Sequence, residues 1–471
     1  MRVSAVVWTL PVGLVVVGVV LLYVWIGADA AMELTERLPI PENAPAAPAD
    51  EGKAVLLPGQ PVKFGGVPAD VPGAWPRFRG ANFDAICRDN NVLARTWAAE
   101  GPRVLWSIEV GEGYAGPAVL AGRVFLLDYD REKQADVVRC LSLADGEDIW
   151  RYSYGIKIKR YHGMSRTVPA VTDKYIVTLG PKCQVTCLDS ASGQFRWMLN
   201  LVNDFKAKVP AWYAGQCPLI DGDRAIIAVG GDCLMMAVDC ETGQVVWKSP
   251  NPNRWVMTHS SIMPTEFMGT PMYVYCASGG VVGVSAKDGS VLWETTEWRV
   301  STANVPSPVV VGEGLIFVSG GYNAGSMMLR LVQEGDRINA QPVFRLDAQV
   351  FGSPQQTPIF YDGYIYGVRP DKQLACLDLD GRVVWSSTSA HRFGLGPYTI
   401  ARSNPPSVGL IYVMNDSGVL TLAEATPTGY IQLAEAKVLD GIESWGPMAV
   451  ASGRLVLRDL TRMICLDIAQ R

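Results

Sequence analysis

The chain has 471 residues, of which 49% are hydrophobic and 18% charged, with a net charge of −5 and a pI near 5.5. Because no basic stripe is present to neutralise phosphates, we expect no nucleic-acid partner. The length would allow several domains, but the internal repeat described below predicts one large β domain behind an N-terminal extension.

The N-terminal extension begins with an apolar stretch. Residues 3–27 carry no charge, Arg2 precedes them and Asp29 follows. This stretch is long enough to span a bilayer, and the positive charge before it predicts that the following domain lies outside the cytoplasm. Residues 1–30 are therefore expected to be a single-pass anchor in the inner (cytoplasmic) membrane, with the domain in the periplasm. Ala28-Asp29-Ala30 resembles a cleavage site, so a removed signal peptide stays open as the alternative.

A second segment, residues 31–73, is rich in proline and alanine, which predicts a semi-extended tether. The folded domain is expected to span residues 74–471. It opens with Trp75-Pro76-Arg77-Phe78, whose aromatic side chains we expect to pack on the domain.

The domain repeats one pattern, seen most clearly in residues 237–247: a strand, a tight Asp…Gly turn and a second strand that ends on tryptophan. Glycine supplies the positive φ of the turn, and tryptophan supplies a large apolar surface for docking one repeat on the next. Short strands that repeat every 40–50 residues or so predict a propeller. Phe344 stands near the one position where a tryptophan is missing, and the expected docking residues are Trp106, Trp150, Trp197, Trp247, Trp293 and Trp385.

A proline precedes each repeat, where it suits the start of a strand, and these prolines give the number of repeats. There are eight such prolines, which predict eight four-stranded blades: Pro117, Pro169, Pro218, Pro264, Pro308, Pro358, Pro397 and Pro447. The last copy stops after residues 463–467 without a fourth strand, whereas residues 104–108 form a spare one before the first copy. Pairing the two would close the ring and leave no open edge.

The cysteines are expected to be structural. Cys140, Cys187, Cys376 and Cys465 occupy a repeat position that holds alanine or glycine in other copies, which indicates a small buried site and not a ligand. Cys217 and Cys233 lie on neighbouring strands of one copy, and their pairing is left open.

The loops that lead into the first strand of each blade are the candidate binding site, because they surround one mouth of the channel and are rich in polar and aromatic residues. The three histidines belong to non-adjacent blades, so no metal site is expected. The alternative is that these side chains only line a water-filled channel. The candidate ligand-binding residues are His162, Arg166, Trp212, Gln216, His259, Asn304, Gln355, Gln356, His391, Glu443 and Trp445.

The repeat Ala237-Val238-Asp239…Thr242-Gly243…Trp247 resembles that of the quinoprotein-like propellers, which include the PQQ-dependent alcohol dehydrogenases and the outer-membrane assembly factor BamB. The dehydrogenases place two adjacent, disulfide-bonded cysteines and a Glu/Asn/Asp calcium site against the cofactor. This sequence has no adjacent cysteine pair, and it lacks a cysteine just after its apolar segment, where the lipoprotein BamB has one.

The resemblance supports three functions, because one fold can serve several. The first is a membrane-anchored, monomeric scaffold that binds cell-envelope proteins or an unidentified small ligand, with no cofactor and no catalytic residue. The second is a quinoprotein oxidoreductase for alcohols or sugars, with PQQ and Ca²⁺ in the mouth against Arg166, Trp212 and Trp445. The third is a propeller that binds carbohydrate or another polymer.

Overall fold

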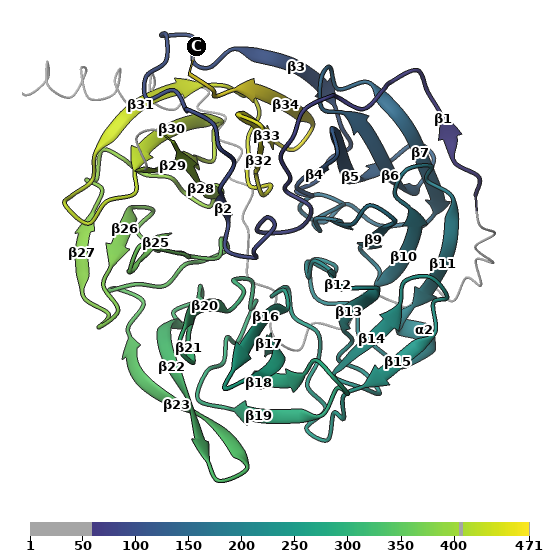
Figure 1. Cartoon of the computed structure of the whole chain (residues 1–471), viewed down its shortest axis with the longest axis vertical. Coiled ribbons are helices and arrows are strands. Elements are labelled where there is room, and N and C mark those ends of the chain that lie inside the picture. Colours follow the sequence, from purple (N-terminus) through teal and green to yellow (C-terminus); the bar gives the residue numbers. More distant parts are fainter. Residues whose placement is uncertain (1–58, 405–407, 471) are drawn as a thin grey trace, which may run out of the picture. The chain divides into compact units, whose positions relative to one another are not determined.

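The computed structural model describes residues 59–404 and 408–470. The expected membrane anchor and the first part of the expected tether lie outside these residues. Within them, no helix combines the length and the apolar character needed to cross a membrane. The strands form a ring of eight antiparallel blades around a central axis (Figure 1).

Seven blades are continuous in sequence, and each runs from an inner to an outer strand. Blade 1 consists of β4 (Ala118–Leu120), β5 (Arg123–Asp130), β6 (Ala135–Ser142) and β7 (Asp148–Gly155). Blade 2 consists of β8 (Ala170–Val171), β9 (Tyr175–Leu179), β10 (Gln184–Asp189) and β11 (Phe195–Asn200). Blade 3 consists of β12 (Leu219–Asp221), β13 (Arg224–Ala228), β14 (Met235–Asp239) and β15 (Val245–Lys248). Blade 4 consists of β16 (Met263–Phe267), β17 (Thr270–Ala277), β18 (Gly280–Ser285) and β19 (Val291–Thr295).

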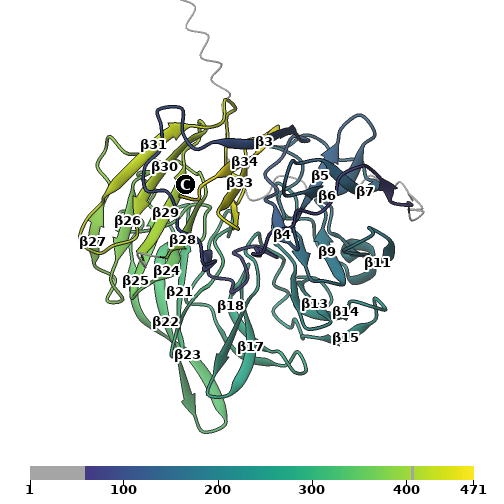
Figure 2. The same cartoon turned by 45° about the horizontal axis from the view of Figure 1, so that its top comes forward.

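The next three blades follow the same order. Blade 5 consists of β20 (Val309–Gly312), β21 (Leu315–Gly320), β22 (Gly325–Glu334) and β23 (Arg337–Leu346), and blade 6 of β24 (Ile359–Tyr361), β25 (Tyr364–Val368), β26 (Leu374–Leu377) and β27 (Val383–Ser386). Blade 7 consists of β28 (Tyr398–Ser403), β29 (Val408–Met414), β30 (Val419–Glu424) and β31 (Gln432–Lys437). The short helix α2 (Leu201–Phe205) follows β11, and the hairpin β22–β23 projects beyond the ring (Figure 2).

Blade 8 closes the ring with strands from both ends of the domain. Its inner strands are β32 (Ala449–Ala451), β33 (Arg454–Arg458) and β34 (Arg462–Asp467), and its outer strand is β3 (Val104–Glu109). Trp106 on β3 lies opposite Cys465 on β34. This confirms the predicted closure and the eight-bladed propeller.

Neighbouring blades are joined by the repeat tryptophans. The indole nitrogen of Trp197 on blade 2 donates to the carbonyl of Cys240 on blade 3 at 2.8 Å. Gly243, in the β14–β15 turn of blade 3, has a φ of 73°, and a Cβ there would lie 2.7 Å from the Trp197 ring. The turn therefore needs glycine for two reasons, its backbone conformation and the space that the ring occupies. The same contact joins Trp106 to Gly146, Trp150 to Gly193, Trp247 to Gly289 and Phe344 to Gly381.

Trp293 differs from this pattern. Its indole lies over its own blade, with the nitrogen 3.3 Å from the sulfur of Met272, and Gly283 opposite it leaves room for the ring. Blade 5 has no tight Asp…Gly turn to receive Trp293, because β22 and β23 extend into the long hairpin. Trp385 does reach the next blade, where its indole donates to the carbonyl of Thr426 at 2.7 Å.

The cysteine position of the repeat lies directly opposite the tryptophan. Cys187 pairs with Trp197 across the β10–β11 ladder, and Cys140 pairs with Trp150 in blade 1. All ten cysteines lie in the described part of the chain, where each is buried and free, including Cys217 and Cys233. A small side chain at this position lets the large ring opposite it pack flat, which explains the exchange with alanine and glycine.

Residues 59–73, which composition assigned to the tether, lie on the propeller in this structure. Strand β1 (Val62–Lys63) pairs with β7, so that Val62 lies opposite Arg151 at the outer edge of blade 1. Further along, the amide of Ala69 donates to the carbonyl of Gly122 at 2.9 Å. These backbone bonds to blade 1 are long-range contacts that a proline-rich composition does not reveal.

Residues 75–95 then cross the centre of the ring, and we call them the crossing segment (Figure 1). Trp75 bridges to Val119 of blade 1 and is 3% exposed, which confirms that the opening aromatic residues pack on the domain. Strand β2 (Ile86–Cys87) adds in parallel to β28 of blade 7, and Leu93 bridges to Ala469 beyond blade 8. The crossing segment therefore ties blades 1, 7 and 8 together through the middle of the ring.

Candidate functional site

Eight loops lead into the inner strands β4, β8, β12, β16, β20, β24, β28 and β32, and we call them the mouth loops. Because each enters its blade at the start of the inner strand, the mouth loops lie at one face of the ring. A relay of hydrogen bonds fixes several of them to one another. The amide of Cys217 donates to Ser261 Oγ, that of Ser261 to Ser307 Oγ and that of Ser307 to Thr357 Oγ1, each at 2.9 Å.

Arg166, in the loop before blade 2, lies at the centre of one group of mouth residues. Its guanidinium donates to the carbonyl of Trp212, in the loop before blade 3, and to that of Tyr161 at 2.8 Å. It also lies 5.2 Å from the centre of the Tyr114 ring. Burial lowers the pKa of Arg166 to about 10, so the group stays charged at neutral pH.

His259 lies beside Trp212, with the two rings 6.4 Å apart. Its amide donates to the carbonyl of Asn304 at 3.1 Å, and a Cβ on Gly215 would lie 2.8 Å from its Nδ1. Burial, together with the nearby charge of Arg166, lowers the pKa of His259 to about 4. The imidazole is therefore neutral at pH 7 and serves as a packed polar ring beside a cation.

Tyr114 connects this group to the loop before blade 8. Its ring stacks on Trp445 with centroids 5.3 Å apart and an interplanar angle of 25°, and its hydroxyl donates to Glu443 Oε2 at 2.6 Å. The indole of Trp445 donates to Asp416 Oδ1 at 2.7 Å. The structure thus brings together Tyr114, Arg166, Trp212, His259, Glu443 and Trp445, which we call the mouth cluster.

Tyr114 is absent from the residues predicted from sequence, although a signal for it exists. It stands three residues before Pro117, as Arg166 stands three residues before Pro169. Pro117 precedes β4 in the way that Pro169 precedes β8. Tyr114 and Arg166 therefore hold the same position relative to the prolines of their loops.

Two predicted residues have structural roles. Gln216 is buried and pairs with Ala228 of β13, accepting from its amide at 2.7 Å and donating to its carbonyl at 3.0 Å. Gln356 donates to the carbonyls of Leu395 and Trp445, both at 3.1 Å, and so ties three mouth loops together. Gln355 is partly exposed in the same loop. Gln216 and Gln356 therefore hold the mouth loops in place.

Asn304 and His162 lie beside the mouth cluster. Asn304 is 4% exposed, and its side-chain amide has no hydrogen-bond partner within the described residues. Its main-chain carbonyl accepts from the main-chain amide of His259. His162 packs edge-on against Tyr161 with ring centroids 5.3 Å apart, and Tyr161 in turn lies 6.3 Å from Trp212. Both residues therefore border the Arg166 side of the cluster.

The third histidine does not join the others. His391 Nδ1 lies 3.0 Å from Thr388 Oγ1, and its ring lies 5.3 Å from that of Tyr430, which packs on the docking residue Trp385. This position is near the outer strand β27, because the loop from β27 to β28 starts there before it turns inward. His391 therefore lies apart from the other two histidines, and its part in ligand binding stays a prediction.

These features define a class of protein, the eight-bladed propeller with tryptophan-docked blades. Within that class, the family model described as outer membrane protein assembly factor BamB matches residues 133–387, more than half of the chain. The chain belongs to this family. No match is found among the curated proteins.

Solved structures share the fold at low sequence identity. BamB from Moraxella catarrhalis is 14% identical, with a TM-score of 0.55 over 78% of this chain and 99% of that one. A europium-containing methanol dehydrogenase is 12% identical, with a TM-score of 0.59 over 83% of this chain and 91% of that one. The quinohemoprotein alcohol dehydrogenase from Comamonas testosteroni is 13% identical, with a TM-score of 0.57 over 84% and 81% of the two chains.

The dehydrogenase neighbours raise the question of whether a PQQ–metal centre would fit the mouth. Within residues 59–404 and 408–470, no group of three or more His, Cys, Asp or Glu side chains could hold a metal ion. The carboxylate of Glu443 already accepts from Tyr114, and Arg166 already donates to three carbonyls. The sequence also lacks an adjacent cysteine pair. The residues of the mouth therefore do not fit such a centre.

Proposed function

We propose that this protein is a scaffold of the cell envelope that binds a partner protein through the mouth loops. The observation that carries the proposal is the mouth cluster itself, in which Tyr114 joins Arg166 on one side to Glu443 and Trp445 on the other. Arginine, tryptophan and tyrosine are the residues that most often supply the binding energy of protein interfaces. Here they are held in place by hydrogen bonds, which reduces the entropy lost on binding.

Exposed apolar side chains lie on the same face of the ring as the cluster. Ile442 precedes Glu443 in the loop before blade 8 and is 67% exposed, and Tyr322 in the β21–β22 turn is 51% exposed. This turn faces the same way as the mouth loops, since a Cβ on its Gly321 would lie 3.0 Å from Pro354 in the loop before blade 6. Such residues around an aromatic and arginine centre are typical of a protein-binding surface.

The proposal also places the propeller at a membrane. The uncharged residues 3–27 behind Arg2 support an anchor in the inner membrane, with the propeller in the periplasm. Membership of an outer-membrane assembly factor family agrees with an envelope location. Fractionation of cells that produce the full chain, followed by protease treatment of intact spheroplasts, tests this part: the propeller should be membrane-bound and degraded.

The binding surface is tested by placing a charge on each face of the ring. Ile442→Asp and Tyr322→Asp alter the mouth face, whereas Met268→Asp alters the β16–β17 turn on the opposite face, where Met268 is 70% exposed. If partners bind the mouth, affinity purification of the tagged full chain should lose the same envelope protein with the first two variants and retain it with the third. Equal recovery with all three variants would contradict the proposal.

A further inference from the structure

A separate cavity lies inside the ring. It has a volume of 620 Å³ and lies between the crossing segment and the inner strands of blades 4 to 7. None of its lining residues belongs to the mouth cluster. Its volume is within the usual range for small-molecule sites, about 300–1,000 Å³.

The base of the cavity carries a buried cation. Arg79 of the crossing segment is 5% exposed, and its guanidinium donates to four backbone carbonyls, including those of Thr357 at 3.1 Å and Pro358 at 3.0 Å in blade 6. The other two acceptors are the carbonyls of Phe83 and Asp84. Burial lowers the pKa of Arg79 to about 10, so it is charged at pH 7. Carbonyl dipoles orient this charge, but they do not neutralise it.

Two more arginines stand at the rim of the cavity, Arg88 from the crossing segment and Arg402 from β28. Arg88 forms an ion pair with Asp84 at 2.6 Å, and the only other acid in the lining is Asp362. Three arginines against two aspartates leave the lining with one excess positive charge. A single negative charge on a ligand would balance it.

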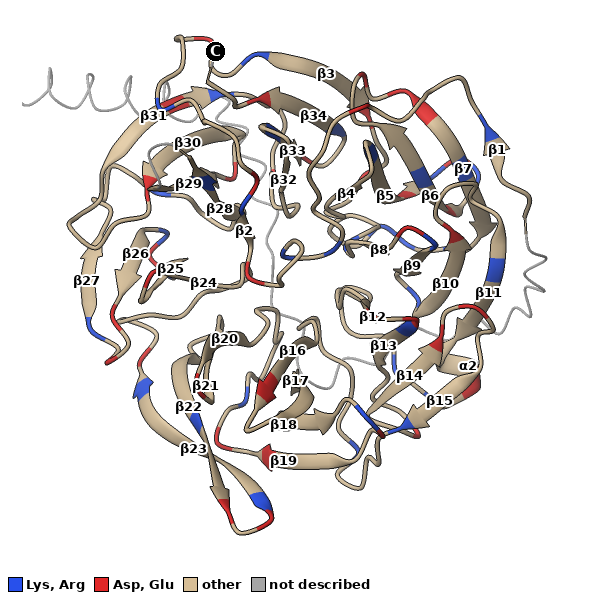
Figure 3. Cartoon of the chain, in the orientation of Figure 1, with Lys and Arg blue, Asp and Glu red and all other residues tan. Residues whose placement is uncertain are grey.

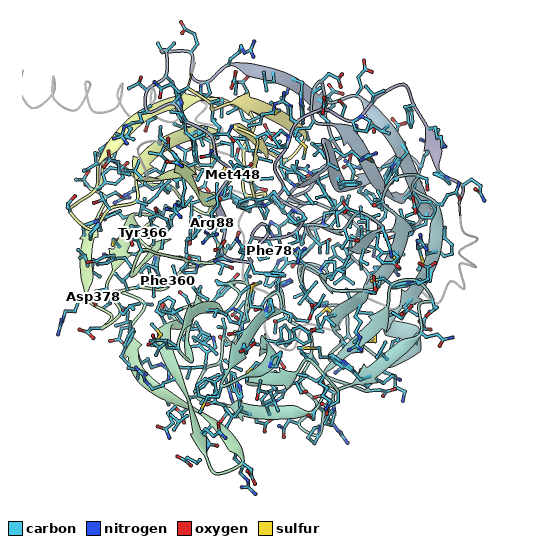
Figure 4. All side chains as sticks on the ribbon, in the orientation of Figure 1. Phe78, Arg88, Phe360, Tyr366, Asp378 and Met448 are labelled. Atoms are coloured by element: carbon cyan, nitrogen blue, oxygen red, sulfur yellow. The ribbon has the colours of Figure 1, made fainter. Side chains whose placement is uncertain are left out.

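The walls next to these arginines are aromatic. Phe83 comes from the crossing segment, and Phe360 and Tyr361 come from β24. The Tyr361 ring packs closely on Gly409 of blade 7, where an added Cβ would lie 2.8 Å from it, so its position is fixed. Figure 4 shows Arg88 near the centre of the ring, Phe360 farther out and Asp378 at the outer rim. Flat apolar walls beside guanidinium groups suit a planar body that carries an acid.

We propose that this cavity is a binding site for a small aromatic carboxylate, in which Arg402 and Arg88 bind the acid and Phe83, Phe360 and Tyr361 enclose the ring. The site lies between the crossing segment and blades 6 and 7, so a bound ligand would contact the segment and these blades at once. It is separate from the partner-binding surface proposed above, and neither proposal depends on the other.

The test uses 1-naphthoate as the probe and the uncharged 1-naphthamide as its matched control, titrated into the full chain by calorimetry. Naphthoate should bind saturably with a stoichiometry near one. Naphthamide should bind at least 10-fold more weakly because it lacks the negative charge, and a 10-fold difference corresponds to about one charge-assisted hydrogen bond. Equal affinity for the two compounds, or no binding of naphthoate at millimolar concentration, would overturn the proposal.

Variants then locate the site. Arg402→Gln should weaken naphthoate binding by about 10-fold or more, the loss expected for one charged contact. Arg382→Gln is the control, since Arg382 is an exposed arginine of blade 6 outside the cavity, with a side chain 78% exposed. Both residues are exposed, so both variants should fold and melt like the parent protein. An equal affinity of the two variants for naphthoate would show that the probe binds elsewhere and would overturn the proposal.

Discussion

Tyr114 and Glu443 are 329 residues apart in sequence, yet the hydroxyl of Tyr114 donates to Glu443 Oε2 at 2.6 Å. This bond joins the mouth loops before blades 1 and 8, on either side of the point where the ring closes. It also positions the phenol ring between Arg166 and Trp445. A contact of this kind stabilises the fold and shapes the proposed binding surface at the same time.

The two roles can be separated with Tyr114→Phe. The variant keeps the ring and loses the hydrogen bond to a carboxylate, so unfolding in urea should show a loss of about 1–2 kcal/mol. Tyr175→Phe is the matched control, because Tyr175 donates to Glu241 Oε2 at 2.9 Å away from the mouth. Both variants should lose stability, but only Tyr114→Phe should recover less partner protein. An equal effect of the two on recovery would show that the loss follows stability alone.

Gly243→Ala tests the docking of one blade on the next. The substitution places a Cβ 2.7 Å from Trp197 at a φ of 73°. Gly222→Ala is the control, since Gly222 also has a positive φ, of 57°, but nothing lies within 4 Å of its added Cβ. We expect Gly222→Ala to cost about 1 kcal/mol from the backbone and Gly243→Ala to cost a further 1–3 kcal/mol or so from overpacking. Equal costs in chemical denaturation would contradict the steric role of Trp197.

The buried carboxyl of Asp136 should make the protein lose stability as the pH rises toward neutral. It is fully buried in blade 1, accepts from the Tyr154 hydroxyl at 2.7 Å, and its other oxygen has no partner within the described residues. Burial, with repulsion from Asp128 as a smaller cause, raises its pKa from 3.8 to about 7. The folded state therefore binds a proton more tightly than the unfolded state. This contribution to stability is complete below pH 4 and is lost as the pH rises from about 4 to 7.

The measurement is the free energy of unfolding of the parent and of Asp136→Asn at several pH values. Relative to the parent, the variant should gain stability between pH 4 and pH 7, by up to roughly 4 kcal/mol. A difference that stays constant over this range would show that Asp136 does not titrate as the structure implies.

His259 should act in the opposite direction. Its pKa is lowered from 6.5 to about 4, by burial and by Arg166, so the unfolded state binds the proton more tightly. The stability that it contributes is present above pH 6.5 and is lost as the pH falls from 6.5 to 4. His259→Gln should therefore lose less stability than the parent on acidification through this range. A parallel loss in both proteins would contradict the neutral imidazole of His259.

Much of the fold could be predicted from the sequence because its repeat is local. The Asp…Gly turn and the tryptophan lie within eleven residues of each other in the copy at 237–247, so pattern alone placed the strands, their number and the closure by residues 104–108. The crossing segment could not be predicted, because its contacts with blades 6 and 7 involve backbone groups hundreds of residues away. Nothing in a local pattern distinguishes such a segment from a tether.

The candidate site could be predicted only in part, because a local pattern does not show where each loop runs in space. Sequence position identified the mouth loops, but it could not show how far along each loop the chain turns inward, and His391 lies before that turn. Arg166, Trp212, His259, Glu443 and Trp445 do lie together, through Tyr114. Charge gave little guidance, because acidic and basic residues alternate around the ring without a broad area of one sign (Figure 3).

The central claim, that a partner protein binds the mouth face, is tested most directly by photo-crosslinking in living cells. A photoreactive phenylalanine analogue would replace Ile442 on the mouth face or, as the control, Met268 on the opposite face, both highly exposed at 67% and 70%. Binding at the mouth predicts a discrete crosslinked protein from position 442 and none from position 268. A crosslink from position 268 alone, or the same product from both, would contradict it.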